Sequence, residues 1–203
     1  MSLAVPASPL AARPPALFLR RFSVEEYHRM IQAGVFAHDD RFELLEGWIV
    51  AKMSRNLPHD VALDKSQDAI RQRLPNGWRL RIQSAITTAD SEPEPDLAVV
   101  RGPAERYMSA HPMAPDIALV VEVAESSLSE DRTDKARIYA RAGIGDYWIV
   151  NLIDSVIEVY ADPTGDVPAP QYRDRDTFHA GQSIPMRIDG KQIASVPVNE
   201  LLP

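Results

Sequence analysis

Two carboxylates and a lysine in the middle of the chain have the types and spacing of a metal site. Glu122 lies inside the apolar run IALVVEVA, and Asp96 opens the run DLAVV. Lys135 follows Asp131 by one helical turn. An unpaired carboxylate is costly to ionise in an apolar strand, so Glu122 either meets water and a cation at the end of a sheet or has a raised pKa. We expect Asp96, Glu122 and Lys135 to converge on a divalent metal ion.

Phosphodiester hydrolysis is the chemistry that such residues suit best. Carboxylates hold one or two Mg²⁺ ions, which polarise the phosphate and lower the pKa of the attacking water, while a lysine stabilises charge or orients that water. Asp96 and Glu122 would supply metal-binding oxygens, and Lys135 the cation. The backbone carbonyl of Val123 can add a ligand, because carbonyls along a strand point sideways.

The same residues also have structural explanations. Proline followed by aspartate opens many strands, which makes Asp96 alone a weak signal. Lys135 alone suits a solvated helix residue paired with Asp131. Glu122 is the stronger signal, because apolar strands rarely carry a charge without a reason.

Other charged and aromatic residues leave alternatives open. Glu43 and Glu46, in the motif FELLEG, are exposed acids unless one of them completes the metal shell. His59 lies near a helix start, where a cap or surface role is more common than that of a base. One solvated helix face is expected for Arg132, Arg137 and Arg141, with contact to phosphates as the alternative. Core positions are expected for Trp48, Trp78 and Trp148.

The composition is that of one globular domain. The chain has 203 residues, no cysteine and a net charge of -7. The charge argues against broad, non-specific affinity for nucleic acid, and the lack of cysteine excludes disulfides and fits a cytoplasmic protein. No run is long enough to span a membrane. We expect a flexible, Pro- and Ala-rich tail over residues 1–19 and a single domain over residues 20–203.

Hydrophobic periodicity predicts the elements that position the acids. The unbroken run around Glu122 indicates a strand covered on both faces. A helix with a capping box at Ser127 and Glu130 should follow it to about Ala142, and another should run from Pro58 to about Leu74 on the opposite face. Further expected elements are a capped helix from Ser23 to Gly34, strands in RFELLEGWIVAKM, WRLRIQSAITT, DYWIVN, VIEVYA and SIPMRI, and a connection in which Tyr107 and Met108 cover part of the core. The predicted architecture is a mixed α/β (α+β) fold.

Several motifs carry a resemblance to a known family. FELLEG, EPEPDLAVV, LVVEVAESSLSEDRTDKARIYARAGIGDYWIVN and VIEVY resemble a large bacterial family of putative restriction endonucleases, common in cyanobacteria, within the PD-(D/E)xK nuclease superfamily. The resemblance covers roughly Phe22 to Leu202. It implies a restriction-endonuclease-like mixed β-sheet flanked by helices, and Mg²⁺-dependent cleavage of DNA.

The resemblance also implies roles for individual residues. The acid of the family's first motif falls on Glu43, and its later acids fall on Asp96 and Glu122. The superfamily lysine should stand at position 124, which is Ala124 here. Lys135, on the following helix, takes its place in this family.

The sequence therefore supports two main hypotheses and a weaker third. The first is an endodeoxyribonuclease that uses Mg²⁺, for which Mn²⁺ can substitute, and that acts on DNA as a homodimer, since duplex DNA has two strands to cut and two-fold symmetry is common. The second, motivated by Ala124 and the net acidity, is a nuclease-like module that binds nucleic acid or a protein without cleaving. A glycosidase with two carboxylates is weaker, because the apolar setting of Glu122 near a lysine suits metal chemistry better.

Overall fold

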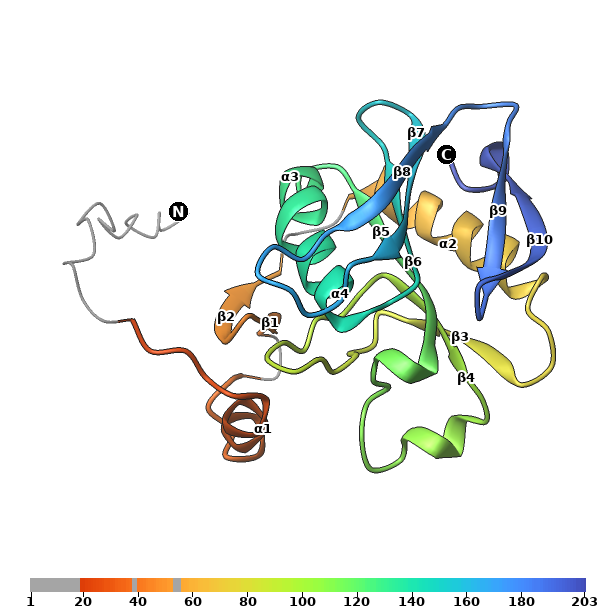
Figure 1. Ribbon diagram of the computed structural model, residues 1–203. Helices are drawn as coiled ribbons and strands as arrows, with labels where there is room; N and C mark the ends of the chain where they lie inside the picture. The colour runs from red at the N-terminus through yellow and green to blue at the C-terminus, as the bar shows by residue number, and fades with distance from the viewer. Residues whose placement is uncertain (1–18, 38–39, 53–55) are drawn as a thin grey trace, which may run out of the picture.

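The computed structural model describes residues 19–37, 40–52 and 56–203 (Figure 1). The predicted tail lies outside these residues except for Leu19. In the described ranges, no helix is long and apolar enough to cross a membrane.

A six-stranded sheet forms the centre of the fold, in the order β3-β4-β5-β6-β7-β8. β5 and β6 are parallel, and the other neighbouring pairs are antiparallel. The strands are β3 (Trp78–Ile82), β4 (Leu97–Arg101), β5 (Ile117–Ala124), β6 (Asp146–Asn151), β7 (Val156–Pro163) and β8 (Tyr172–Phe178). The fold is the predicted mixed α+β fold, and every residue of β5 is buried, as expected for a strand covered on both faces.

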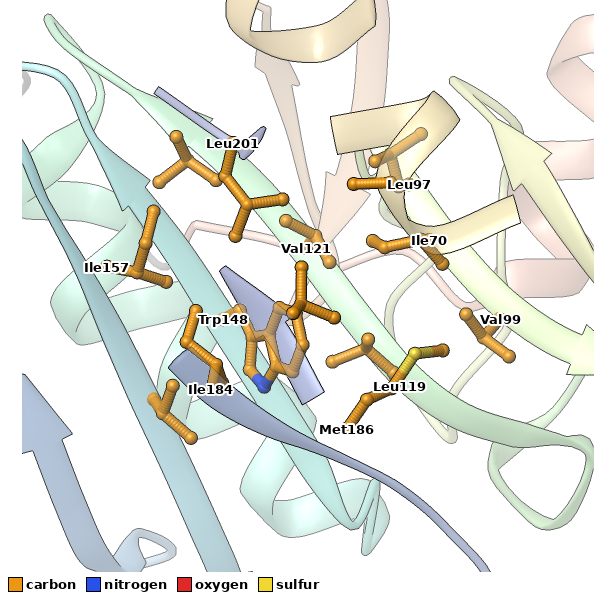
Figure 2. Close-up of a cluster of buried hydrophobic side chains, with 14 of the residues drawn as sticks. Ile70, Leu97, Val99, Leu119, Val121, Trp148, Ile157, Ile184, Met186 and Leu201 are labelled. Carbon is orange, nitrogen blue, oxygen red and sulfur yellow. The ribbon is translucent and has the colours of Figure 1, made fainter. Parts of the chain in front are cut away.

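One face of the sheet packs against α2 and a C-terminal hairpin. α2 (Leu57–Arg71) has Pro58 in its first turn, and the hairpin consists of β9 (Ser183–Ile188) and β10 (Lys191–Pro197), followed by the short helix η4 (Val198–Glu200). Figure 2 shows Trp148 of β6 in the middle of this core, beside Ile184 and Met186 of β9. Trp148 is fully buried, as predicted, whereas Trp48 and Trp78 are only partly buried.

The opposite face is covered by one helical segment that follows β5 (Figure 1). It consists of α3 (Leu128–Glu130), a π-helical turn η3 (Asp131–Lys135) and α4 (Ala136–Ala142). The segment ends at Gly143 as predicted, but the expected capping box is wrong. Ser127 has helical backbone angles and its hydroxyl donates to Asp131 Oδ2 at 2.6 Å instead of accepting from a backbone amide.

The N-terminal part adds a helix and a hairpin. α1 (Val24–Gln32) begins with the predicted capping box, and β1 (Phe42–Leu45) pairs with β2 (Trp48–Ala51). The turn requires Gly47, whose φ is +80° and where a Cβ would lie 2.7 Å from the Cβ of Arg21. The amide of Glu92 donates to the carbonyl of Leu44, which ties the hairpin to the loop before β4. This contact brings β1 towards the acids of the central strands.

Two local predictions are wrong. The strand expected to run through WRLRIQSAITT ends at Ile82, because Gln83 has a φ of +44° that takes the chain out of the sheet. In the β4–β5 connection, which contains the short helices η1 (Ala104–Tyr107) and η2 (Ala114–Asp116), Tyr107 packs against the core, but Met108 is 85% exposed.

Candidate active site

A cavity of about 530 Å³ lies where β1, the start of α2, the loop before β4 and the end of β5 meet. Acidic groups dominate its lining, and three basic side chains and one histidine accompany them. The ionisable lining residues are Glu43, Glu94, Asp96, Glu122, Glu125, Glu130, Arg41, Lys52, Lys135 and His59. The four predicted side chains and Val123, predicted to contribute its carbonyl, therefore all line one cavity.

Glu122 is buried, with only 3% of its surface exposed, and three hydrogen bonds hold its carboxylate. Its Oε1 accepts from Lys135 Nζ at 3.1 Å and from the Tyr139 hydroxyl at 2.8 Å, and its Oε2 accepts from the Asp96 amide at 3.3 Å. β5 places this carboxylate on the face that packs against α4. The helical segment after β5 therefore supplies both side-chain partners.

Lys135 is buried among acids. Besides Glu122, its ammonium lies 3.7 Å from Glu43 Oε1 and 3.6 Å from Asp131 Oδ1. Only 7% of the residue is exposed, so the alternative of a solvated lysine is wrong. Three carboxylates from β1, β5 and η3 thus surround one cation.

Asp96 lies beside this group, immediately before β4. Its Oδ2 accepts from the Val123 amide at 2.9 Å and lies 3.1 Å from His59 Nε2. His59 is buried, so the expectation that it is a cap or surface residue is wrong. It is the third residue of α2, and nothing in the local sequence indicates that its ring turns towards an acid 37 positions later.

The two acids of FELLEG have different environments. Glu43 is 3% exposed, and its Oε2 accepts from the Glu94 amide at 3.0 Å inside the cavity. Glu46 lies outside it and forms ion pairs with Arg137 at 2.7 Å and Arg141 at 3.0 Å. Glu43 therefore joins the acids, and Glu46 does not.

The expected solvated face of three arginines is also wrong. Arg137 and Arg141 bind Glu46, while Arg132 binds Glu158 of β7 through Nε at 3.0 Å. Their side chains are 23–37% exposed. These arginines hold the helical segment to the hairpin and the sheet.

Burial and charge shift the pKa values of the cavity residues and of Asp131, which lies beside Lys135. Burial raises the pKa of Glu122 to about 8, although Lys135 opposes that rise. Burial also raises the pKa of Asp131, again opposed by Lys135. Burial acts against ionisation of Asp96, but the bonds from His59 and the Val123 amide outweigh it and lower the pKa. Although burial alone lowers the pKa of Lys135, the carboxylates of Glu122 and Glu43 raise it well above its usual value.

The donors in the cavity suit a hard divalent cation. Carboxylate and carbonyl oxygens are the ligands that Mg²⁺ prefers. The acids outnumber the cations, and His59 Nδ1 in the cavity lining and Asp131 Oδ1 behind Lys135 are among the buried atoms of the described ranges without a hydrogen-bond partner. As the side chains stand, no three acidic or histidine groups of the described chain are arranged to hold one ion. An ion would therefore replace contacts that these groups now make with Lys135, His59 and backbone amides.

Comparison with known proteins places this geometry in a family. Residues 24–190 match the Uma2 model, described as a putative restriction endonuclease. The chain belongs to this Uma2 family. The predicted family resemblance is thereby confirmed, and the description of the Uma2 family supports a hydrolytic nuclease.

A solved structure supports the fold independently. The crystal structure of a putative nuclease from Anabaena variabilis ATCC 29413 aligns with a TM-score of 0.63 at 13% identity, covering 89% of this chain and 97% of that chain. At that identity the likeness concerns the fold alone. No curated protein matches the sequence.

Proposed function

We propose that the protein is a Mg²⁺-dependent endodeoxyribonuclease whose site comprises Glu43, Asp96, Glu122 and Lys135. The observation that carries the proposal is the buried Lys135, 3.1 Å from Glu122 in a solvent-reached cavity that also contains Glu43 and Asp96. Burying four ionisable groups together is costly unless they bind something. Because the chain belongs to a family described as nucleases, we infer that these four groups are kept together in the cavity for nuclease chemistry.

The proposed site residues have two roles, which are metal binding and stabilisation of charge on the phosphate. Asp96, Glu122, Glu43 and the carbonyl of Val123 would hold Mg²⁺, for which Mn²⁺ could substitute. When bound, the ion polarises the phosphate and lowers the pKa of the attacking water. Lys135 stabilises the charge that develops on the phosphate oxygens. Lys135, whose ammonium lies 3.7 Å from Glu43 Oε1, takes the place of the lysine that is absent at Ala124.

Two neighbouring side chains orient the acids. The Tyr139 hydroxyl donates to Glu122, and His59 lies against Asp96. Such partners fix a carboxylate in one rotamer, which lowers the cost of binding an ion. We further propose that residues 20–203 act as one domain and that two copies form a homodimer that cuts both strands of duplex DNA.

Cleavage of supercoiled plasmid DNA tests the proposal. The protein should nick or linearise the plasmid with Mg²⁺ or Mn²⁺ and stop when a chelator is added. Asp96→Asn and Glu122→Gln should each abolish cleavage. Glu158→Gln is the matched control, since Glu158 is also a buried acid on the central sheet but lies outside the cavity. Cleavage that survives both changes in the cavity would refute the site.

A nuclease-fold module that binds without cleaving is the second candidate. The observation that favours it is that the acids of the described chain bind Lys135, His59 and backbone amides, and are not arranged around one point where an ion could bind. Isothermal titration calorimetry separates the two functions. A Mg²⁺ or Mn²⁺ binding heat that disappears in Asp96→Asn supports the nuclease, whereas no binding of either ion supports the silent module.

A further inference from the structure

A second group of titratable side chains lies outside the candidate active site. Glu92, in the loop before β4, is 3% exposed and lies 2.7 Å from Nε2 of His28 on α1. Thr87 donates its hydroxyl to the same carboxylate at 2.9 Å. His111, from the β4–β5 connection, has its Nε2 at 3.9 Å from Glu92 Oε1. Three separate segments therefore converge on one buried carboxylate.

Solvent reaches this group through a cavity of its own. The cavity has a volume of about 500 Å³ and is lined by Glu92, both histidines and Thr87, with Tyr107 and Met113 among its more apolar neighbours. The side chains of His28 and His111 are each 40% exposed, so their rings can turn. The cavity shares no lining residue with the one that contains Lys135.

We propose that His28, His111 and Glu92 form a binding site for Zn²⁺. Two imidazoles and one carboxylate are a donor set that zinc accepts in proteins, with water in the fourth position. Imidazole nitrogen suits zinc and not Mg²⁺, which prefers oxygen. The proposed zinc site and the all-oxygen active site therefore differ in the metal that they select.

The distances are close to those that a zinc ion requires. Ligand atoms at about 2.0–2.1 Å from a tetrahedral zinc lie roughly 3.3 Å from one another. The two contacts of Glu92 bracket this value, at 2.7 Å to His28 and 3.9 Å to His111. The ring centroids of the two histidines are 6.4 Å apart, whereas two imidazoles on one such zinc are separated by about 5 Å. Binding thus needs the exposed rings to close by about an ångström, because no three-ligand group is preformed in the described part of the chain.

Zinc bound at this point would stabilise the fold whether or not the protein is a nuclease. A zinc ion at this point would link α1 to the loop before β4 and to the β4–β5 connection. A ligand that binds only the folded state raises its stability. Zinc should therefore raise the melting temperature, and the histidine variants should remove that effect.

Calorimetric titration of the full chain with ZnCl₂ tests the site, using histidine-to-glutamine variants. The Asp96→Asn background is used throughout, so that binding in the candidate active site contributes little. His28→Gln and His111→Gln keep a side-chain donor for Glu92 but provide a poor zinc ligand, so a merely structural contact survives. His179→Gln is the control, because His179 is exposed and belongs to neither cavity.

The expected result is one zinc ion whose affinity falls at least roughly tenfold in each cavity variant, because losing a ligand should cost no less than losing a partner that only supports one. His179→Gln should bind zinc as the parent does, and circular dichroism should show all variants folded. Absence of zinc binding in the parent would overturn the proposal. Binding that persists unchanged in both His28→Gln and His111→Gln would overturn it equally, and neither outcome bears on DNA cleavage.

Discussion

Replacing Lys135 by methionine tests the buried cation at the centre of the site. The change keeps the length of the side chain and removes an ammonium that lies within 4 Å of three carboxylates. Removing one partner of a buried ion pair costs about 3–5 kcal/mol, because the remaining charge is left uncompensated. Because burial already raises the pKa of Glu122, its carboxyl can take up a proton when the ammonium is lost, which limits the cost. The lower end of that range, about 3 kcal/mol, is therefore the expectation at pH 7.

Urea denaturation in the presence of a chelator measures this loss. For a chain of this size, about 3 kcal/mol corresponds to a decrease in melting temperature of roughly 6–12 °C. Arg137→Met is the matched control, since the side chain of Arg137 is 37% exposed and solvent screens its pair with Glu46, which should therefore contribute less than the buried cation. The double variant Lys135→Met/Glu122→Gln should lose less than the sum of the single changes, because it removes both partners of one contact.

Two results would refute this reasoning. One is a loss in Lys135→Met no greater than in Arg137→Met, which would mean that the acids do not need the cation. The other is strict additivity in the double variant, which would mean that Lys135 and Glu122 are not coupled.

Three further predictions concern the fold around the site. Burial acts against ionisation of Glu158, but hydrogen bonds from Arg132 and other partners outweigh it and lower the pKa from 4.5 to about 2. A carboxylate whose pKa is lowered by folding stabilises the fold above its unfolded pKa, and this stabilisation is lost as the pH falls through the folded pKa. Glu158→Gln should therefore lower the free energy of unfolding by about 2 kcal/mol at pH 7, after a discount for the partly exposed arginines, and by almost nothing at pH 2. An equal loss at both pH values in urea denaturation would contradict this. Tyr139→Phe removes a buried donor to Glu122 and should lower the free energy of unfolding by about 1–3 kcal/mol, and a neutral result would contradict the bond. Trp148→Ala leaves a cavity in the core of Figure 2 and should cost about 3–5 kcal/mol by calorimetry, whereas a cost near 1 kcal/mol would mean that the core collapses to fill the space.

The sequence predicts those parts of the fold that depend on local pattern. An acid inside IALVVEVA is visible without a structure, because charge in an apolar strand is costly. The capping box of α1 depends on residues three positions apart, and so does not need tertiary information. The sequence also indicates the helix that follows β5, and such a crossover is the connection that the parallel pairing of β5 with β6 requires.

The parts that could not be predicted depend on contacts between distant segments. His59 and Asp96 are 37 positions apart, and only the packing of α2 on the sheet brings them together. Likewise, Arg137 finds Glu46 at a separation of 91 positions, whereas helical spacing suggested a solvated face. Ser127 has the residue type of a cap, but its hydroxyl is taken by the buried carboxylate of Asp131 at the π-helical turn.

Anomalous diffraction from crystals soaked in Mn²⁺ tests the central claim most directly. Mn²⁺ substitutes for Mg²⁺ at oxygen sites and gives an anomalous signal that locates it. We predict a peak in the cavity between the carboxylates of Asp96 and Glu122, within bonding distance of both and next to the carbonyl of Val123. A fully soaked crystal with no peak there, or with both carboxylates still bound to His59 and Lys135, would contradict the account.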